Sequence, residues 1–240
     1  MRNNPILFAL GYGGLCMAAA AVDPPPISMD VERLRADGFV RLFDGETLDG
    51  WSRKGGEGEY HVEDGCIIGT GANVRANTFL CTEETFGDFV LIFEMKFDDL
   101  SGNSGLMFRA GEREDGRVFG YQCEHDNRDR SWSAGLYDEA RRGWLEPAAD
   151  DDAKKAAFTE QGRDLFRLDD WNTMVIECVG LRTRIWLNGE LRVDFTDESG
   201  KDFDRPGFIG LQVHAGESCR VRWRNLYLHD RTRPATPMEP

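Results

Sequence analysis

Three short stretches of this sequence alternate between apolar residues and residues that can move protons or bind hydroxyl groups: 104–109, 120–126 and 207–214. Alternate side chains of a β-strand point to opposite faces, and same-face neighbours lie about 6.5–7 Å apart. If the three strands are neighbours, one sheet face carries a cation, two carboxylates, two amides and an imidazole, from Arg109, Gln122, Glu124, Asp126, Gln212 and His214. Such groups can bind a hydroxyl-rich ligand and act as general acid and base.

A simpler explanation applies to each residue singly. The outward face of an antiparallel sheet is polar, and Arg–Glu or Arg–Asp pairs there can be ordinary cross-strand ion pairs. Six such groups on one face, however, favour a functional site over a set of ordinary ion pairs. Glu124, Asp126 and His214 could also bind a divalent metal ion, because carboxylate and imidazole suit several such ions, and otherwise we expect no cofactor. His125 has the opposite parity, so we expect it in the core or at a strand end and not among the catalytic residues.

An aromatic and charged segment follows, residues 131–145, which contains Trp132, Tyr137, Asp138, Glu139, Arg141, Arg142 and Trp144. Aromatic rings stack on the apolar faces of sugar rings, while guanidinium groups bind the hydroxyl edge. Alternatively, the aromatic residues only pin this loop to the fold and the two arginines face solvent. We favour a ligand-binding loop, because loops on rigid β scaffolds often carry function.

The elements that must position these residues are mainly strands. Glu63-Asp64-Gly65 and Asn188-Gly189-Glu190 are typical of tight hairpins, since Asp-Gly and Asn-Gly accept positive φ. Residues 149–162 have a helical composition and interrupt the strands, and residues 30–36 predict a short helix with Asp30 as its N-cap. The pattern predicts an all-β fold, an antiparallel two-sheet jelly-roll sandwich with one short helical insertion.

The N-terminus has the pattern of a secretory signal over residues 1–22, with Arg2, an uncharged stretch and small residues before a cleavage site. Cys16 is preceded by Leu15, whereas the lipid-attaching peptidase needs a small residue there, which disfavours a lipid anchor. We therefore expect a periplasmic or extracellular protein without stable membrane insertion after cleavage. The predicted divisions are a signal (1–22), a linker with a short helix (23–36), one jelly-roll domain (37–230) and a tail (231–240).

The net charge narrows the possible partners, and the cysteine count limits the possible disulfides. With 29 basic and 43 acidic residues the net charge is −14, which argues against nucleic acid and anionic membranes as partners, because both would repel the chain. Five cysteines remain after signal removal, and an odd number cannot form a complete disulfide framework. Cys66 and Cys81 lie on strands predicted to be neighbours and could form a disulfide. We expect the others to be buried thiols.

Residues Glu124 to Asp129 (EHDNRD) resemble the E-x-D-x-x-E nucleophile strand of laminarinase-type glucanases, with Asp129 in place of the last Glu. A retaining glycosidase needs two carboxyl groups about 5–5.5 Å apart. An endo-glucanase is therefore one alternative function.

A broader resemblance starts at Phe39–Trp51 (FVRLFDGETLDGW), which is similar to the opening motif of the 3-keto-disaccharide hydrolase family. It covers nearly all of residues 37–229, through segments 78–98, 102–109, 120–126, 134–145, 171–189 and 207–225. The resemblance implies a concanavalin-like jelly roll, export, and action on a small partner, a sugar or glycoside oxidised at C3.

The chemistry that the resemblance implies is elimination. A C3 ketone acidifies the C2 proton, so a base can remove it, the enolate is stabilised, and the C1 group leaves before water adds. The residues offer Glu124 or His214 as base, Arg109 or a divalent cation as enolate stabiliser, and Asp126 or Tyr137 as acid. Substrate-binding candidates are Asn103, Gln122, Trp132, Arg141, Arg142, Trp144 and Gln212.

The sequence allows alternatives for the identity of the base and for the function of the domain. Many family members carry Glu directly after the strand tyrosine and Gln two residues later, whereas here Gln122 precedes Glu124, which leaves the base undecided. Many jelly rolls also bind sugars without cleaving them, so a non-catalytic carbohydrate-binding module is a second alternative. Two carboxylates beside an imidazole favour the enzyme, because binding alone needs no such groups.

Overall fold

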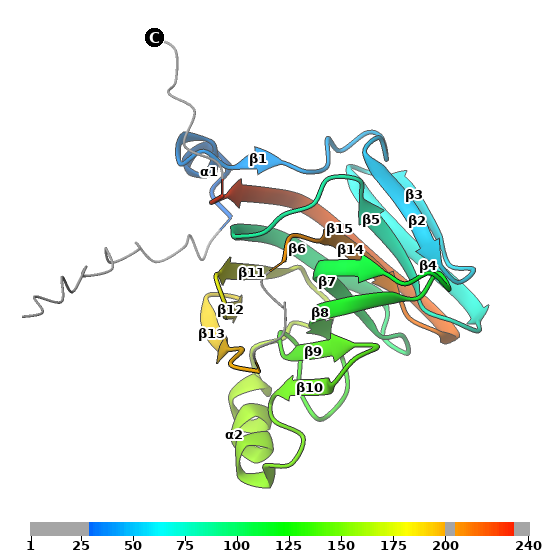
Figure 1. The fold of residues 1–240 in the computed structure, drawn as a ribbon. Helices are drawn as coiled ribbons and strands as arrows, with labels where there is room; N and C mark the ends of the chain where they lie inside the picture. Colours follow the sequence, from blue (N-terminus) through cyan, green and yellow to red (C-terminus); the bar gives the residue numbers. More distant parts are fainter. Residues whose placement is uncertain (1–28, 200–204, 233–240) are drawn as a thin grey trace, which may run out of the picture.

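The computed structural model describes residues 29–199 and 205–232, which form two antiparallel sheets (Figure 1). The first sheet contains β1 (Val40–Arg41), β3 (Glu59–Glu63), β4 (Cys66–Val74), β6 (Phe89–Asp99), β11 (Asn172–Val179), β12 (Arg182–Leu187), β13 (Glu190–Thr196) and β15 (Gly216–Asp230). The second contains β2 (Trp51–Gly55), β5 (Thr78–Thr82), β7 (Ser104–Glu112), β8 (Val118–His125), β9 (Leu136–Glu139), β10 (Gly143–Glu146) and β14 (Phe208–Val213).

The strand orders are β13-β12-β11-β6-β15-β4-β3, with β1 beside β15, and β10-β9-β8-β7-β14-β5-β2. This arrangement confirms the predicted two-sheet sandwich. It also confirms that β7, β8 and β14 lie side by side, with β7 in the middle.

Two helices flank the sandwich at the predicted places. The first, α1 (Val31–Ala36), begins after Asp30, whose carboxylate accepts a hydrogen bond from the Arg33 backbone N–H, and its Leu34 packs on the outer side of the first sheet. The second, α2 (Asp152–Gly162), is the helical insertion, and it lies at the end of the molecule near β10 and β13 (Figure 1).

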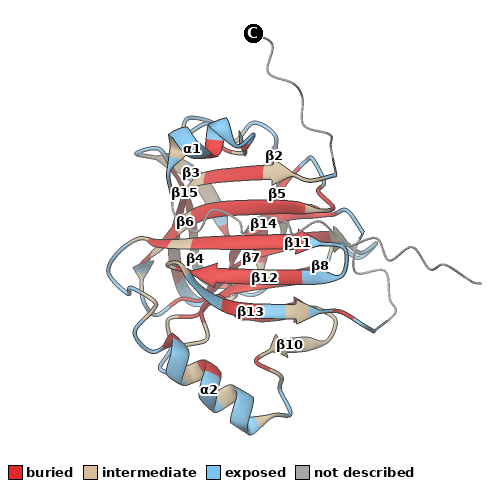
Figure 2. Ribbon diagram, turned by 90° about the vertical axis from the view of Figure 1, so that its left-hand side faces the viewer, coloured by how far each residue is buried: buried red, intermediate tan, exposed pale blue. Residues whose placement is uncertain are grey.

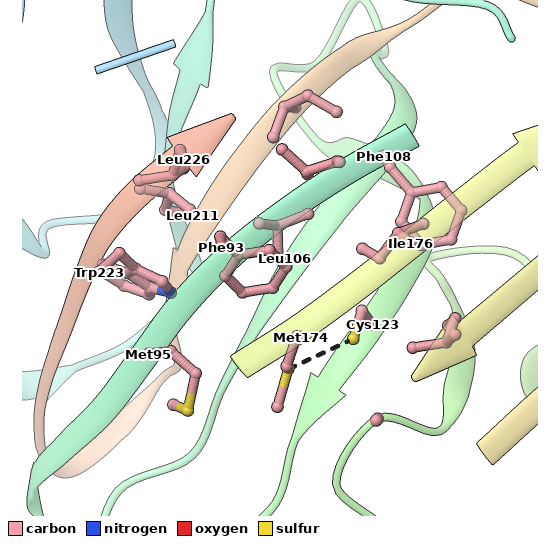
Figure 3. Packing of buried hydrophobic residues seen from close by; sticks show 14 of the residues in the cluster. Phe93, Met95, Leu106, Phe108, Cys123, Met174, Ile176, Leu211, Trp223 and Leu226 are labelled. Carbon is pink, nitrogen blue, oxygen red and sulfur yellow. Dashed lines mark hydrogen bonds between the residues drawn. The ribbon is translucent and has the colours of Figure 1, made fainter. Parts of the chain in front are cut away.

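The core lies between the sheets and is built by strand alternation. From β6 it takes the five residues predicted to share a face: Phe89, Leu91, Phe93, Met95 and Phe97. Leu106 and Phe108 from β7 meet them from the other sheet. Figure 3 shows these two side chains near Phe93 and Met95 of β6, together with Trp223 and Leu226 of β15. The central strands are buried along most of their length (Figure 2). Full burial of one such side chain contributes about 1.5–3 kcal/mol.

The predicted disulfide is wrong. Cys66 lies in β4 of the first sheet and Cys81 in β5 of the second, so they are not on neighbouring strands. Both are free thiols, as are Cys123, Cys178 and Cys219, and all five are buried. Cys123 instead contacts the sulfur of Met174 in the core, 3.7 Å away (Figure 3).

The predicted signal segment, 1–22, lies outside the described residues. Within 29–199 and 205–232, no helix is both long and apolar enough to pass through a bilayer.

Candidate functional site

A pocket of about 220 Å³ opens on the outward face of the second sheet, over β7, β8, β9 and β14. Its lining is almost entirely polar. The residues around it are Asn103, Gln122, Glu124, Arg128, Arg130, Tyr137, Glu139, Trp144, Gln212 and His214.

Strand alternation explains why Gln122 and Glu124 reach this face. Their neighbours Tyr121 and Cys123 point into the core, as predicted, so the residues between them must point outward. Opposite Glu124 on β7 stands Gly105, where a Cβ atom would lie 2.5 Å from the Gln122 side chain. The glycine therefore leaves the space that Gln122 occupies.

Glu124 is the centre of the site. Its side chain is buried, yet Nδ2 of Asn103 donates to Oε1 at 2.9 Å and Nε2 of Gln122 donates to Oε2 at 2.7 Å. The guanidinium of Arg130 lies 3.7 Å from Oε1. Burial raises the pKa of Glu124 to about 7, because desolvation outweighs the two hydrogen bonds and the arginine. A carboxyl group with that pKa is suited to proton transfer near neutral pH.

A chain of amides extends from this carboxylate across the sheet. Nε2 of Gln212 donates to Oε1 of Gln122 at 3.1 Å, and Gln122 in turn donates to Glu124. The backbone of Gln212 is held by Ser104, whose hydroxyl donates to its carbonyl at 2.6 Å. Gln122 and Gln212 are both buried, so their side chains are fixed before any ligand arrives.

Asp126 lies just beyond the end of β8 and does not line the pocket. Its carboxylate is fully buried and forms an ion pair with Arg130, while Ser133 Oγ accepts from its backbone N–H at 2.9 Å. The Arg130 guanidinium lies over the rings of Trp132 and Trp144, 4.8 and 4.9 Å from their centroids. Asp126 therefore fixes the position of a cation beside Glu124.

The far wall belongs to β9. Tyr137 pairs with Gln122 and Glu139 with Gly120, so both side chains point to the outward face. Burial and the nearby carboxylates of Glu139 and Glu124 raise the pKa of Tyr137. Burial also raises the pKa of Glu139, against the opposing charge of Arg117.

His214 stands at the opposite wall, where β14 ends. Its Nδ1 faces the carbonyl oxygen of Ala215. A carbonyl only accepts, so Nδ1 carries the hydrogen and Nε2 is left as an acceptor.

Arg109 does not join the pocket. The ladders from β7 to both neighbours shift register after Phe108, and Arg109 has a φ of +45°, so a bulge reverses its parity. Its buried side chain donates to the carbonyls of Gly87 and Gly180 and pairs with Asp88 at 2.9 Å. The predicted enolate-stabilising position is therefore wrong for this residue.

Three predicted binding residues also lie elsewhere. Arg141 and Arg142 pair with the buried carboxylate of Asp138, and Arg142 reaches Asp197 at 2.7 Å, so these arginines hold the segment to the sandwich. Trp132 stands behind Arg130, and its Nε1 donates to Thr159 of α2 at 2.9 Å. Trp144 does line the pocket.

His125 is fully buried beside Phe93, which confirms its place in the core, and burial lowers its pKa to about 3. Asp129 is exposed on the loop after β8 and does not line the pocket. The carboxyl pair that an endo-glucanase needs is therefore not formed by Glu124 and Asp129.

The predicted metal ligands do not fit a metal ion as a set. The Asp126 carboxylate is taken by Arg130, and it is absent from the pocket that Glu124 and His214 share. In the described part of the chain, no group of three or more His, Cys, Asp and Glu side chains could hold a metal.

The pocket also contains two residues that the sequence pattern did not single out, Arg128 and Arg130, and it contains Glu139, which was placed in the 131–145 segment without a role. The sequence did indicate the face to which Glu139 points, because this residue shares the parity of Tyr137 two residues earlier. The arginines lie on an irregular loop, where no periodicity indicates a direction.

Comparison with known proteins connects these residues to a described family. The model of a 3-keto-alpha-glucoside-1,2-lyase-like domain matches residues 38–229. A 3-keto-disaccharide hydrolase from Bacteroides thetaiotaomicron is 32% identical over 104 residues, which make up 40% of this chain and 34% of that protein. The matched stretch thus spans about a third of that relative.

Solved structures with the same fold include a candidate glycosyl hydrolase from Parabacteroides distasonis (TM-score 0.58, 21% identity, 84% of this chain and 97% of that chain covered). A Bacillus subtilis protein of unknown function with a galectin-like fold gives a TM-score of 0.57 at 12% identity, with 80% and 98% covered. A lichenase from a mouse hindgut metagenome gives 0.51 at 12% identity, with 78% and 96% covered. These likenesses confirm the jelly-roll fold.

Proposed function

The chain belongs to the family of 3-keto-alpha-glucoside-1,2-lyase-like domains, and from this premise we propose that its Glu124 pocket cleaves 3-keto-glycosides. The reaction proceeds by removal of the C2 proton, elimination of the C1 group and addition of water to the resulting double bond. The relative named 3-keto-disaccharide hydrolase supports a substrate of this class.

The observation that carries the proposal is the environment of Glu124. Removal of a proton next to a ketone needs a base whose pKa is close to the working pH. Glu124 is buried, oriented by Asn103 and Gln122, and has a pKa of about 7. Its carboxylate is therefore held in one orientation and is basic enough to accept the C2 proton. The free Nε2 acceptor of His214 makes that residue the second candidate base.

Charge on the enolate oxygen also needs stabilisation, and we assign this role to Arg130 in place of the predicted Arg109. Arg130 supplies a guanidinium at the pocket wall, fixed by Asp126 and by two tryptophan rings. Tyr137 keeps its proton because its pKa is raised, so its hydroxyl can donate a hydrogen bond to the developing charge. Donors fixed in advance toward developing charge contribute about 10²–10³-fold each to turnover.

The test is an assay of the protein on a 3-keto-glucoside and on its unoxidised parent, each with and without a chelator. We expect cleavage of the keto compound alone, and a loss of at least about 10²-fold in Glu124→Gln. Glu59→Gln, an exposed change outside the pocket, is the matched control. Binding without cleavage of either sugar would instead support a carbohydrate-binding module, and chelator sensitivity would show a need for a divalent ion.

We also propose that residues 1–22 direct export, because they have a positive start, an uncharged stretch and small residues before the cleavage site. Cell fractionation and N-terminal sequencing of the mature chain test this. A cytoplasmic protein that still begins at Met1 would contradict it.

A further inference from the structure

A second and larger hollow adjoins the pocket on the same sheet face. Its volume is about 760 Å³, and its walls include Arg75, Asn77, Asp115 and Arg117. Glu139 lines both hollows, and Ala215 of the larger one directly follows His214 of the smaller. The two spaces therefore meet at the Glu139 carboxyl group.

The sizes of the two hollows indicate that they bind different parts of one substrate. Sites that enclose a whole small molecule measure about 300–1,000 Å³, and the pocket around Glu124 is smaller, at about 220 Å³. It can enclose only part of a glycoside. The remaining part, which is linked through the C1 oxygen, needs adjoining space, and the hollow beyond Glu139 provides it.

The surface of this hollow is partly apolar and partly polar, because charged and amide side chains surround an apolar cluster. Phe79, Phe208 and their buried neighbours form that cluster. Lys54 spans it, with Nζ 5.9 Å from the Phe208 ring centroid and 2.7 Å from the carboxylate of Glu112. Beside Glu139, Asn77 is fixed because its Oδ1 accepts from the Ala215 backbone N–H at 2.9 Å. Such a mixed surface suits a sugar ring, which has apolar faces and an edge of hydroxyl groups.

We propose that Glu139 is the acid that protonates the leaving oxygen of the C1 group, and that the hollow beyond it binds that group as a second sugar unit. This inference rests on the proposed function. It assigns the leaving-group role to a residue at the junction of the two hollows, in place of Asp126, whose carboxylate is bound to Arg130.

With these two residues, every proton and electron pair of the elimination has a donor and an acceptor. The C2 proton passes to Glu124, and the C2–H electron pair becomes the C1=C2 double bond. The C1–O bond breaks, and its electron pair stays on the leaving oxygen, which takes the proton of Glu139. Addition of water reverses both transfers: Glu139 accepts a water proton as oxygen bonds to C1, and Glu124 returns a proton to C2. Both carboxyl groups end as they began, and no oxidant or reductant is required.

The state of Glu139 suits this role. It is half-buried, and burial raises its pKa, so it stays protonated at a higher pH than an exposed glutamate does. Its protonated form can also donate a hydrogen bond toward the C1 oxygen before the bond breaks.

Leaving-group dependence tests the acid role. A methoxide leaving group needs a proton, whereas 4-nitrophenolate departs without one. We expect Glu139→Gln to lose at least about 100-fold in kcat on methyl 3-keto-glucoside and less than about fivefold on the 4-nitrophenyl compound. The control Glu59→Gln should change neither rate. Equal losses on both substrates, or no loss, would overturn the acid role while leaving the proposed function intact. If the wild-type protein cleaves neither compound, the proposed function fails and the acid role fails with it.

A second variant tests the sugar subsite separately. Ala76 is exposed and lines the larger hollow, so Ala76→Trp should narrow it without disturbing the core. We expect the KM for a 3-keto-disaccharide to rise about tenfold more than the KM for the methyl glycoside. Equal changes in both KM values would show that the second sugar lies elsewhere.

Discussion

Nδ2 of Asn103, just before β7, donates a hydrogen bond of 2.9 Å to Oε1 of Glu124 at the end of β8, and the two residues are 7% and 5% exposed. This bond favours the ionised form of a carboxyl group that burial drives toward its neutral form. The balance between these two effects sets the pH at which Glu124 can act as a base.

Removal of the Asn103 donor should therefore shift the pH dependence of activity. Asn103→Ala leaves the carboxylate with one hydrogen bond fewer, so its pKa rises further. We expect the acidic limb of kcat/KM against pH to move up by about one unit, with activity recovered at higher pH. Asn127→Ala, whose side chain donates to the Leu100 carbonyl outside the pocket, should leave the profile in place. An unchanged limb in Asn103→Ala would show that Glu124 is not the titrating group.

Glu124 should also make stability depend on pH. Its pKa in the folded protein, about 7, lies above the ordinary value of 4.5, so folding favours the protonated carboxyl group. That contribution is complete below about pH 4 and is lost as the pH rises through 7. The difference corresponds to about 3 kcal/mol. We expect Glu124→Gln to be more stable than the wild type at pH 8 and no more stable at pH 4, as measured by urea unfolding. A constant difference at both pH values would contradict the raised pKa.

Asp126→Asn distinguishes a positioning residue from an acid. Asparagine keeps the shape but removes the charge that holds Arg130. We expect about a tenfold loss of kcat, because the cation is less well placed, with the same relative rates on methyl and 4-nitrophenyl substrates. A loss above about 10³-fold that falls only on the methyl substrate would restore the acid role first predicted for Asp126.

Arg109→Met tests whether Arg109 stabilises the fold or takes part in catalysis. The guanidinium donates to two backbone carbonyls and pairs with Asp88, far from the pocket lining. Its loss leaves those acceptors without a donor, which costs about 2–4 kcal/mol. We expect a lower melting temperature and an unchanged kcat at 20 °C. A large loss of kcat in the folded variant would show that Arg109 does take part in catalysis.

Alternation of residues was sufficient to predict the faces of the regular strands. The core sides of β6, β8 and β14 follow from it, and so do Gln122, Glu124 and Gln212 on the outward face. A strand with period two allows no other arrangement once one face is apolar.

The same rule failed where the strand is irregular or its partner is distant in sequence. At Arg109 a bulge reverses the parity, and the residue types around it give no sign of one. Arg142, which lies between the short strands β9 and β10, pairs with Asp197, 55 residues later. Such a pairing depends on the finished fold, so local sequence cannot indicate it.

The last two strands of the chain occupy central positions. β14 lies between β5 and β7 in one sheet, and β15 lies between β4 and β6 in the other. Strands β4, β5, β6 and β7 therefore each lack one neighbour until the ribosome has made the last two strands, and Gln212 reaches Gln122 only when β14 has been synthesised. The pocket cannot form on a nascent chain that is still short of β14. Until then the chain can complete neither sheet, and the activity proposed for the pocket can appear only afterwards.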